Sequence, residues 1–119
     1  MIRRNLLAMA ALAAVAALPL AAQAAEDKAL KAAIAGPQRA AEHVARDAAR
    51  HPYETLTFWG VKPKQTILEV SPGSGYWTEI LAPYAKATGG TYIATAADLN
   101  NPSLSDAAKK SRAAFEAKY

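Results

Sequence analysis

The chain has 119 residues, a formal charge of +4 and no cysteine. The lack of cysteine excludes a disulfide scaffold, a thiolate metal site and a catalytic thiol, and a metal site is not expected from only two histidines. Lysine and arginine do not cluster with aromatic residues, so the composition gives no support for nucleic-acid binding.

The first 24 residues have the layout of a secretory signal peptide. Arg3 and Arg4 form a positive start, residues 6–20 are almost wholly apolar, and Ala22 and Ala24 are small residues where a signal peptidase cleaves. The apolar run, about fifteen residues, is shorter than the roughly 20 that span a membrane. We therefore expect cleavage after Ala24, giving a periplasmic or secreted protein without a stable membrane anchor. Losing two arginines takes its charge from +4 to +2.

The segment from residue 25 to residue 60 is predicted to be helical. Alanine-rich residues 29–35 favour one helix, and residues 38–50 favour a second. Apolar residues at three- and four-residue spacing in the second helix predict a narrow buried stripe, made of Ala41, Val44, Ala45 and Ala48.

His51 stands directly before Pro52, and a residue in that position is pushed out of helical geometry. The second helix should therefore end there. Pro52 suits the first turn of a short helix that reaches Trp59 and closes at Gly60. His51 is the catalytic candidate that the sequence offers, because histidine is the commonest acid–base residue. The alternative is a helix-end residue that interacts with the helix dipole.

From residue 61 onward, strand patterns alternate with helical ones. Residues 66–70 and 91–96 predict two strands. Residues 76–87 between them are helical in pattern, although Pro83 is expected to kink this helix or end it early. A last helix should begin near Ser103 or Ser105, either of which can cap it. Its inward stripe is expected to consist of Leu104, Ala108, Ser111 and Phe115.

This order of elements predicts an α/β fold in which the two strands pair in parallel. A parallel sheet is normally covered on both faces, and two strands do not make such a sheet. Residues 61–119 are therefore expected to form the first βαβα part of an incomplete, truncated domain.

The loop Ser71-Pro72-Gly73-Ser74-Gly75 joins the first strand to the following helix. Ligands of open α/β folds bind at this end of the sheet, and glycine lets a ligand approach the backbone closely. A dinucleotide fingerprint needs a third glycine where Thr78 stands, and a phosphate loop needs a lysine after Gly75. Neither of these ligands is favoured.

Glu69 late in the strand, followed by Gly73 and Gly75, resembles motif I of class I S-adenosylmethionine-dependent methyltransferases. The residues 50–56 and 79–84 extend the resemblance to a group of predicted exported bacterial methyltransferases, over roughly residues 30–119. The resemblance implies that this chain is the N-terminal portion of a Rossmann-like fold. It also implies that S-adenosylmethionine is the cofactor, bound by Glu69, Ser71, Gly73, Ser74, Gly75 and Asp98.

Three positions depart from the family pattern. Ser71 replaces the first loop glycine, and Pro72 lacks an N–H to offer a ligand. The acid of motif II is expected where Ala96 stands, and Asp98 follows two residues later.

Two classes of function follow from this resemblance. The first is methyl transfer from S-adenosylmethionine to an unidentified acceptor, a reaction that depends mainly on positioning. The alternative is a non-catalytic exported protein that keeps the methyltransferase-like fold and binds another ligand or partner. Export favours the alternative, because the sequence does not show a periplasmic source of S-adenosylmethionine.

Overall fold

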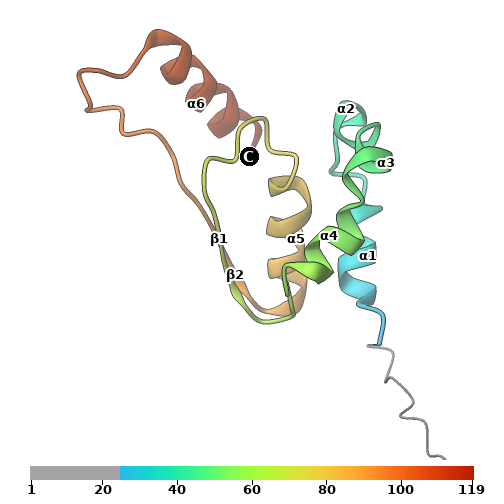
Figure 1. Ribbon diagram of the computed structural model, residues 1–119. Helices are drawn as coiled ribbons and strands as arrows, with labels where there is room; N and C mark the ends of the chain where they lie inside the picture. Colours follow the sequence, from blue (N-terminus) through green and yellow to red (C-terminus); the bar gives the residue numbers. More distant parts are fainter. Residues whose placement is uncertain (1–24) are drawn as a thin grey trace, which may run out of the picture.

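The computed structural model describes residues 25–119, so the predicted signal peptide lies outside the described residues. Helices and a small parallel sheet together make a mixed α/β structure, which confirms the predicted α/β class at this level (Figure 1). In chain order the elements are α1 (Lys28–Ile34), α2 (Ala41–Val44), α3 (Asp47–Arg50), α4 (Pro52–Phe58), β1 (Thr66–Glu69), α5 (Thr78–Thr88), β2 (Thr91–Ala94) and α6 (Asp106–Lys118). Within residues 25–119, no helix combines the length and apolar character that crossing a membrane requires.

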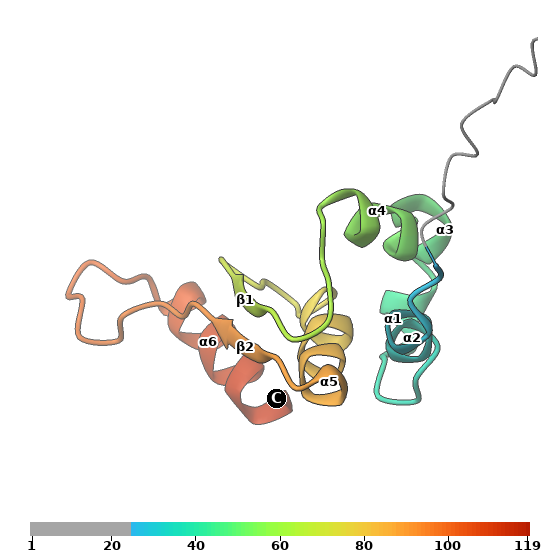
Figure 2. The ribbon, with the colours of Figure 1, turned by 90° about the horizontal axis from the view of Figure 1, so that it is seen from below.

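The strands β1 and β2 pair in parallel, as predicted, with Glu69 opposite Ala94. Helix α5 connects them and packs on one face of the sheet (Figure 2). Ile67 and Tyr92 point to this face and join the core. Leu68 and Ile93 are partners in the register on the opposite face, where they are 59% and 47% exposed.

The core lies between α1, α4 and α5. Its fully buried side chains are Leu30, Leu56, Ile80 and Tyr84. The buried Tyr84 hydroxyl donates a hydrogen bond of 2.5 Å to Asp27, and the same carboxylate caps α1 by accepting from the N–H of Leu30. One acidic side chain thus starts α1 and also ties it to α5.

The prediction of a single helix over residues 38–50 is wrong. This segment forms the two separate turns α2 and α3, and the expected stripe of Ala41, Val44, Ala45 and Ala48 is exposed. The buried residues of the segment are instead Arg39 and His43. Alanine buries little apolar area, so the polar contacts of Arg39 and His43 decide which side of the chain faces the interior.

Pro83 lies inside α5, which continues to Thr88, so the expectation that this proline ends the helix early is wrong. A proline in a helix deprives the carbonyl four residues earlier of its N–H donor. Here that carbonyl belongs to Glu79, and it accepts a hydrogen bond of 2.9 Å from the side-chain amide of Gln38. A distant side chain therefore supplies the donor that Pro83 lacks.

Ser105 caps α6, as predicted, by accepting a hydrogen bond from the N–H of Ala108. None of the thirteen residues of α6 is buried. The predicted inward stripe of α6 is partly wrong, because Ser111 is exposed and Arg112 is half-buried instead. The helix stands apart from α1–α4 at the end of a long connection that follows β2 (Figure 1).

Candidate functional site

The glycine loop turns sharply between β1 and α5. Ser71, Gly73 and Gly75 all have positive φ angles, of 54°, 61° and 90°. The N–H of Ser71 donates to the Thr95 hydroxyl after β2 (2.8 Å), and the N–H of Gly75 donates to the carbonyl of Pro72 (3.0 Å). These bonds fix the loop at the carboxyl ends of both strands.

A first hollow of about 370 Å³ lies beside this loop, within the size range of small-molecule sites. Its walls come from the loop, from the segment after β2 and from α6: Ser71, Pro72, Gly73, Thr95, Ala96, Ala97, Ala108, Ser111, Arg112 and Phe115. A Cβ atom added to Gly73 would meet no atom within 4 Å. The backbone at Gly73 is therefore open to a ligand.

Glu69 does not line this hollow. Its carboxylate belongs to a hydrogen-bond network between β1, β2 and α5. Its Oε2 accepts hydrogen bonds from the Tyr92 hydroxyl (2.5 Å) and the Thr78 hydroxyl (2.9 Å). Burial raises the pKa of Tyr92, and the hydrogen bond to Glu69 raises it further. The carboxylate joins β1, β2 and α5, so it serves the packing of the sheet.

The other predicted residues are spread over the molecule. Asp98 is exposed and accepts the N–H of Asn100 in a turn of the connection to α6. His51 is exposed at the junction of α3 and α4, with a φ of 44°. Gly75 is buried, and the Tyr119 ring occupies the space that a Cβ would need.

A second hollow, of about 470 Å³, lies on the α2 side of the loop. Polar and apolar side chains line it together: Glu42, His43, Arg46, Gly73, Ser74, Ser111, Ala114, Phe115, Lys118 and Tyr119. Gly73, Ser111 and Phe115 also line the first hollow, so the two adjoin at the glycine loop.

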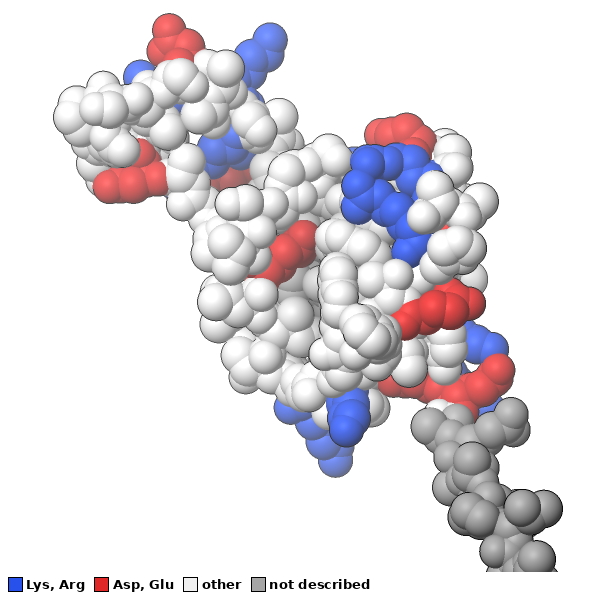
Figure 3. Space-filling view, in the orientation of Figure 1, with Lys and Arg blue, Asp and Glu red and all other residues white. Residues whose placement is uncertain are grey.

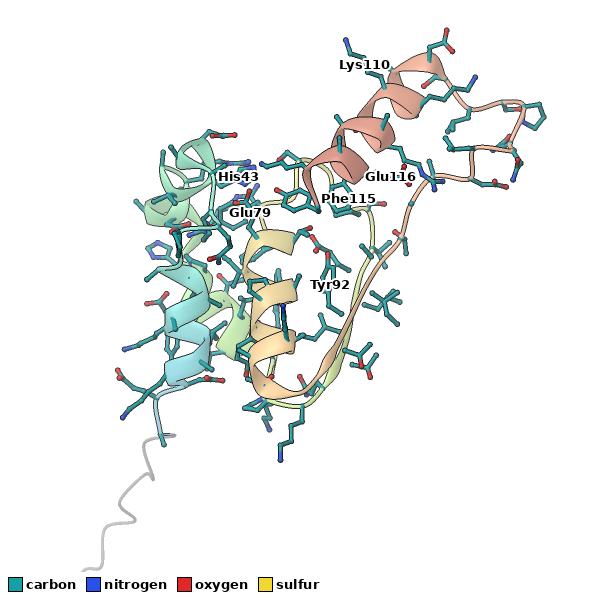
Figure 4. All side chains as sticks on the ribbon, turned by 180° about the vertical axis from the view of Figure 1, so that it is seen from behind. His43, Glu79, Tyr92, Lys110, Phe115 and Glu116 are labelled. Atoms are coloured by element: carbon teal, nitrogen blue, oxygen red, sulfur yellow. The ribbon has the colours of Figure 1, made fainter. Side chains whose placement is uncertain are left out.

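His43 links this second hollow to the interior of the protein. Its Nδ1 lies 2.8 Å from Oε2 of Glu79, and its Nε2 lies 3.2 Å from Oγ of Ser74. The side chains of His43 and Glu79 are almost wholly buried, at 4% and 1% exposure. Figure 4 shows the two pointing toward one another between α2 and α5.

Glu79 is held as a carboxylate. Burial alone would raise its pKa, but hydrogen bonds from Tyr119, His43, Lys118 and the N–H of Ala40 outweigh it and lower the pKa to about 2. The Tyr119 hydroxyl lies 2.7 Å from Oε1 and the Lys118 ammonium 3.0 Å from the same oxygen. The last turn of α6 is therefore bound to the start of α5 through this one side chain.

A second ionic group lies beside His43. Arg39 makes two hydrogen bonds to Asp47, of 2.6 and 2.8 Å, and the Tyr76 hydroxyl donates to the same carboxylate. These bonds lower the pKa of Asp47, and burial raises the pKa of Tyr76 to about 12. Arg46 and Arg50 lie against the Tyr76 ring, and Figure 3 shows basic side chains gathered at this end of the molecule. The group attaches α3 to the start of α5.

Sequence reasoning missed His43 and Glu79. His43 was not part of the buried stripe predicted for residues 38–50, and Glu79 lies 36 residues further along the chain. Patterns of spacing along a helix or strand do not relate two residues that are so far apart in the sequence. Within residues 25–119, no group of three or more metal-ligating side chains is suited to hold a metal ion.

No protein-family model, curated protein or solved structure matches the chain. Its functional interpretation therefore depends on its own residues.

Proposed function

We propose that the protein binds S-adenosylmethionine at the glycine loop and transfers the methyl group to an acceptor. One observation carries the proposal: Gly73, with a φ of 61°, opens its backbone to a hollow at the carboxyl ends of two parallel strands. This is the place where open α/β folds bind their ligands.

The walls of the first hollow suit this cofactor in several respects. Ala96, Ala97 and Ala108 leave room for a planar base. The Thr95 hydroxyl accepts from Ser71 and keeps its own hydrogen to donate to a ribose. Arg112 provides a positive group for a carboxylate, although it also forms an ion pair with Glu116 at 2.8 Å.

Bound S-adenosylmethionine would supply the electrophilic methyl group, and the protein would supply positioning. The loop would hold the donor in the first hollow and leave the adjoining second hollow for the acceptor. Phe115 lines both hollows and would help to exclude water from their junction. No protein nucleophile is required for such a transfer.

The substitution Gly73→Asn tests the proposal. Asparagine tolerates a positive φ, so the loop should keep its course while the new side chain enters the hollow. We expect calorimetric titration to show at least tenfold weaker S-adenosylmethionine binding, with an unchanged circular dichroism spectrum. Gly75→Val is a poorer test, because its Cβ would collide with the Tyr119 ring and disturb α6.

The matched control is Gly60→Asn. Gly60 also has a positive φ, of 78°, with no atom within 4 Å of an added Cβ, and it lines neither hollow at the loop. The affinity of the Gly60→Asn variant for S-adenosylmethionine should equal that of the wild type. Wild-type affinity in Gly73→Asn would remove the loop from the site.

A second candidate is a non-catalytic protein with a methyltransferase-like fold that binds another ligand or partner. The position of two acids favours it. Glu69 is bonded to Tyr92 and Thr78, and Asp98 lies outside the hollow, so neither acid is presented to a ribose. A wild-type protein without saturable S-adenosylmethionine binding would support this candidate against methyl transfer.

We also propose that the protein is exported and that its mature form begins at Ala25. The support is the layout of residues 1–24, described from the sequence. Mass spectrometry of the periplasmic fraction should find this N-terminus. A form beginning at Met1 in the cytoplasmic fraction would contradict export.

A further inference from the structure

Three side chains, two of which line the second hollow, form a relay that methyl transfer does not require. Ser74, His43 and Glu79 are joined by the 3.2 Å and 2.8 Å contacts described above. Ser74 belongs to the turn between β1 and α5, and it is exposed, whereas the other two residues are buried. A nucleophile within reach of a base, and a base oriented by a third group, is the arrangement that activates a hydroxyl.

The partners of His43 determine its tautomer. The Glu79 carboxylate can only accept hydrogen bonds, so Nδ1 must carry a hydrogen and donate it. In the neutral ring, Nε2 then holds a lone pair directed at the Ser74 hydroxyl. His43 is therefore placed to remove the proton of Ser74.

We propose that Ser74 is an activated nucleophile for acyl transfer, with His43 as its general base and Glu79 as the residue that positions His43. The proposed substrates are esters of small carboxylic acids. This activity does not depend on the proposed binding of S-adenosylmethionine.

The reaction balances without an oxidant or reductant. The Ser74 oxygen attacks the ester carbonyl carbon while its proton passes to Nε2 of His43. The bond to the alcohol oxygen then breaks, and His43 returns the proton to the leaving alcohol. Water attacks the acyl-serine with His43 again as base, releasing the carboxylic acid and restoring Ser74. Glu79 stays ionised and stabilises the imidazolium that forms.

The second hollow contains the surfaces that such a substrate needs. Both Ser74 and His43 line it, and Ala114 and Phe115 provide an apolar wall for a short acyl group. The N–H of Gly75 is already donated to Pro72, so it is not free for the carbonyl oxygen. Helix α5 begins at Thr78, four residues after Ser74, and its N-terminal end favours the negative charge that develops on that oxygen.

Packing alone does not account for Ser74 in the relay. The Glu79 carboxylate is already held by the N–H of Ala40, the Tyr119 hydroxyl and Lys118. Ser74 is exposed and buries little surface, and within residues 25–119 the one hydrogen-bonding contact of its hydroxyl is with Nε2 of His43, at 3.2 Å. The contact with Nε2 of His43 instead places the Ser74 hydroxyl for proton transfer.

A fluorophosphonate probe, which forms a covalent adduct with activated serines, tests the proposal on the protein itself. Peptide mass spectrometry should find the adduct on Ser74, and Ser74→Ala should lose it. His43→Gln should slow labelling about 100-fold, the size of a typical general-base contribution. The matched control Ser103→Ala changes another exposed serine and should label at the wild-type rate.

Several results would overturn the proposal: no adduct in the wild type, an adduct at another serine, or undiminished labelling of His43→Gln. Because His43 is buried, a measurement on the wild type avoids any effect of substitution on folding. Long-range ¹H–¹⁵N spectra of the neutral His43 ring should show Nδ1 protonated and Nε2 unprotonated. The opposite tautomer would exclude the relay. Neither experiment uses S-adenosylmethionine, so failure here leaves the proposed methyl transfer unaffected.

Discussion

Helices α1 and α6 lie on opposite sides of α5 and contact it in different ways (Figure 2). The seven-residue α1 buries Leu30 and Ala33 against α5 and α4. The thirteen-residue α6 buries none of its residues and reaches α5 through its last turn, where Lys118 and Tyr119 meet Glu79. The shorter helix is therefore the more firmly packed.

The difference shows that the size and spacing of apolar side chains, more than helix length, decide how a helix is held. A short helix stabilises a fold when its apolar face is large enough to offset the entropy of ordering it. Alanines and Ser111 leave α6 without such a face. Its attachment to Glu79 depends on charge and hydrogen bonds, so pH should affect the α6 side more than the α1 side.

The largest loss of stability is expected from truncating a leucine on the α1 side of α5, and the matched truncation on the α6 side should cost less. Leu30→Ala removes a side chain that is 1% exposed and should cost about 2–5 kcal/mol of unfolding free energy. Leu104→Ala, at a half-buried position just before α6, should cost about 1 kcal/mol or less. Urea unfolding of both variants measures the two values. Equal losses would show that both sides are packed alike.

Acid should weaken the α6 side through Glu79. Folding lowers the pKa of this carboxyl to about 2, so its contribution to stability is complete above the unfolded-state pKa, near 4.5. As pH falls below about 5 toward 2, that contribution, on the order of 3 kcal/mol, is lost. Glu79→Gln should flatten this part of the stability curve, measured by Tm at several pH values. Substituting the exposed Glu54 in the same way should leave the curve unchanged.

Tyr119→Phe gives the smallest effect. It removes the hydroxyl that donates to Glu79 at 2.7 Å and should cost about 0.5–1.5 kcal/mol, the range for one hydrogen bond. Hydrogen exchange should quicken in the last turn of α6, while the amide of Leu30 keeps its protection. A loss of protection at Leu30 would mean that the two sides of α5 unfold together.

Local patterns predicted the elements whose signal lies in adjacent residues. The strands begin at Thr66 and Thr91, as expected from runs of β-forming residues, and Ser105 caps the last helix. Residues 38–50 were mispredicted because alanines at nearly every spacing do not mark which side faces the core. That side is set by Asp47 and Glu79, which bind Arg39 and His43 only once the chain has folded.

The same limit applies to the site. A hollow lies beside the loop that the pattern around Ser71 and Gly73 singled out, at the end of the strands. It could not show that Glu69 would be bonded to Tyr92, which lies 23 residues further on and reaches it through strand pairing. Nor could it show that Gln38 would supply the donor that Pro83 lacks.

The face of the sheet opposite α5 has a practical consequence for handling the protein. Leu68 and Ile93 are 59% and 47% exposed there as partners in the strand register, and Val70, the residue after β1, is 67% exposed. Apolar surface of this kind favours self-association, and the attraction strengthens with warming and with sulfate or phosphate salts. Cold, dilute, low-salt buffers should therefore keep the purified protein in solution longest.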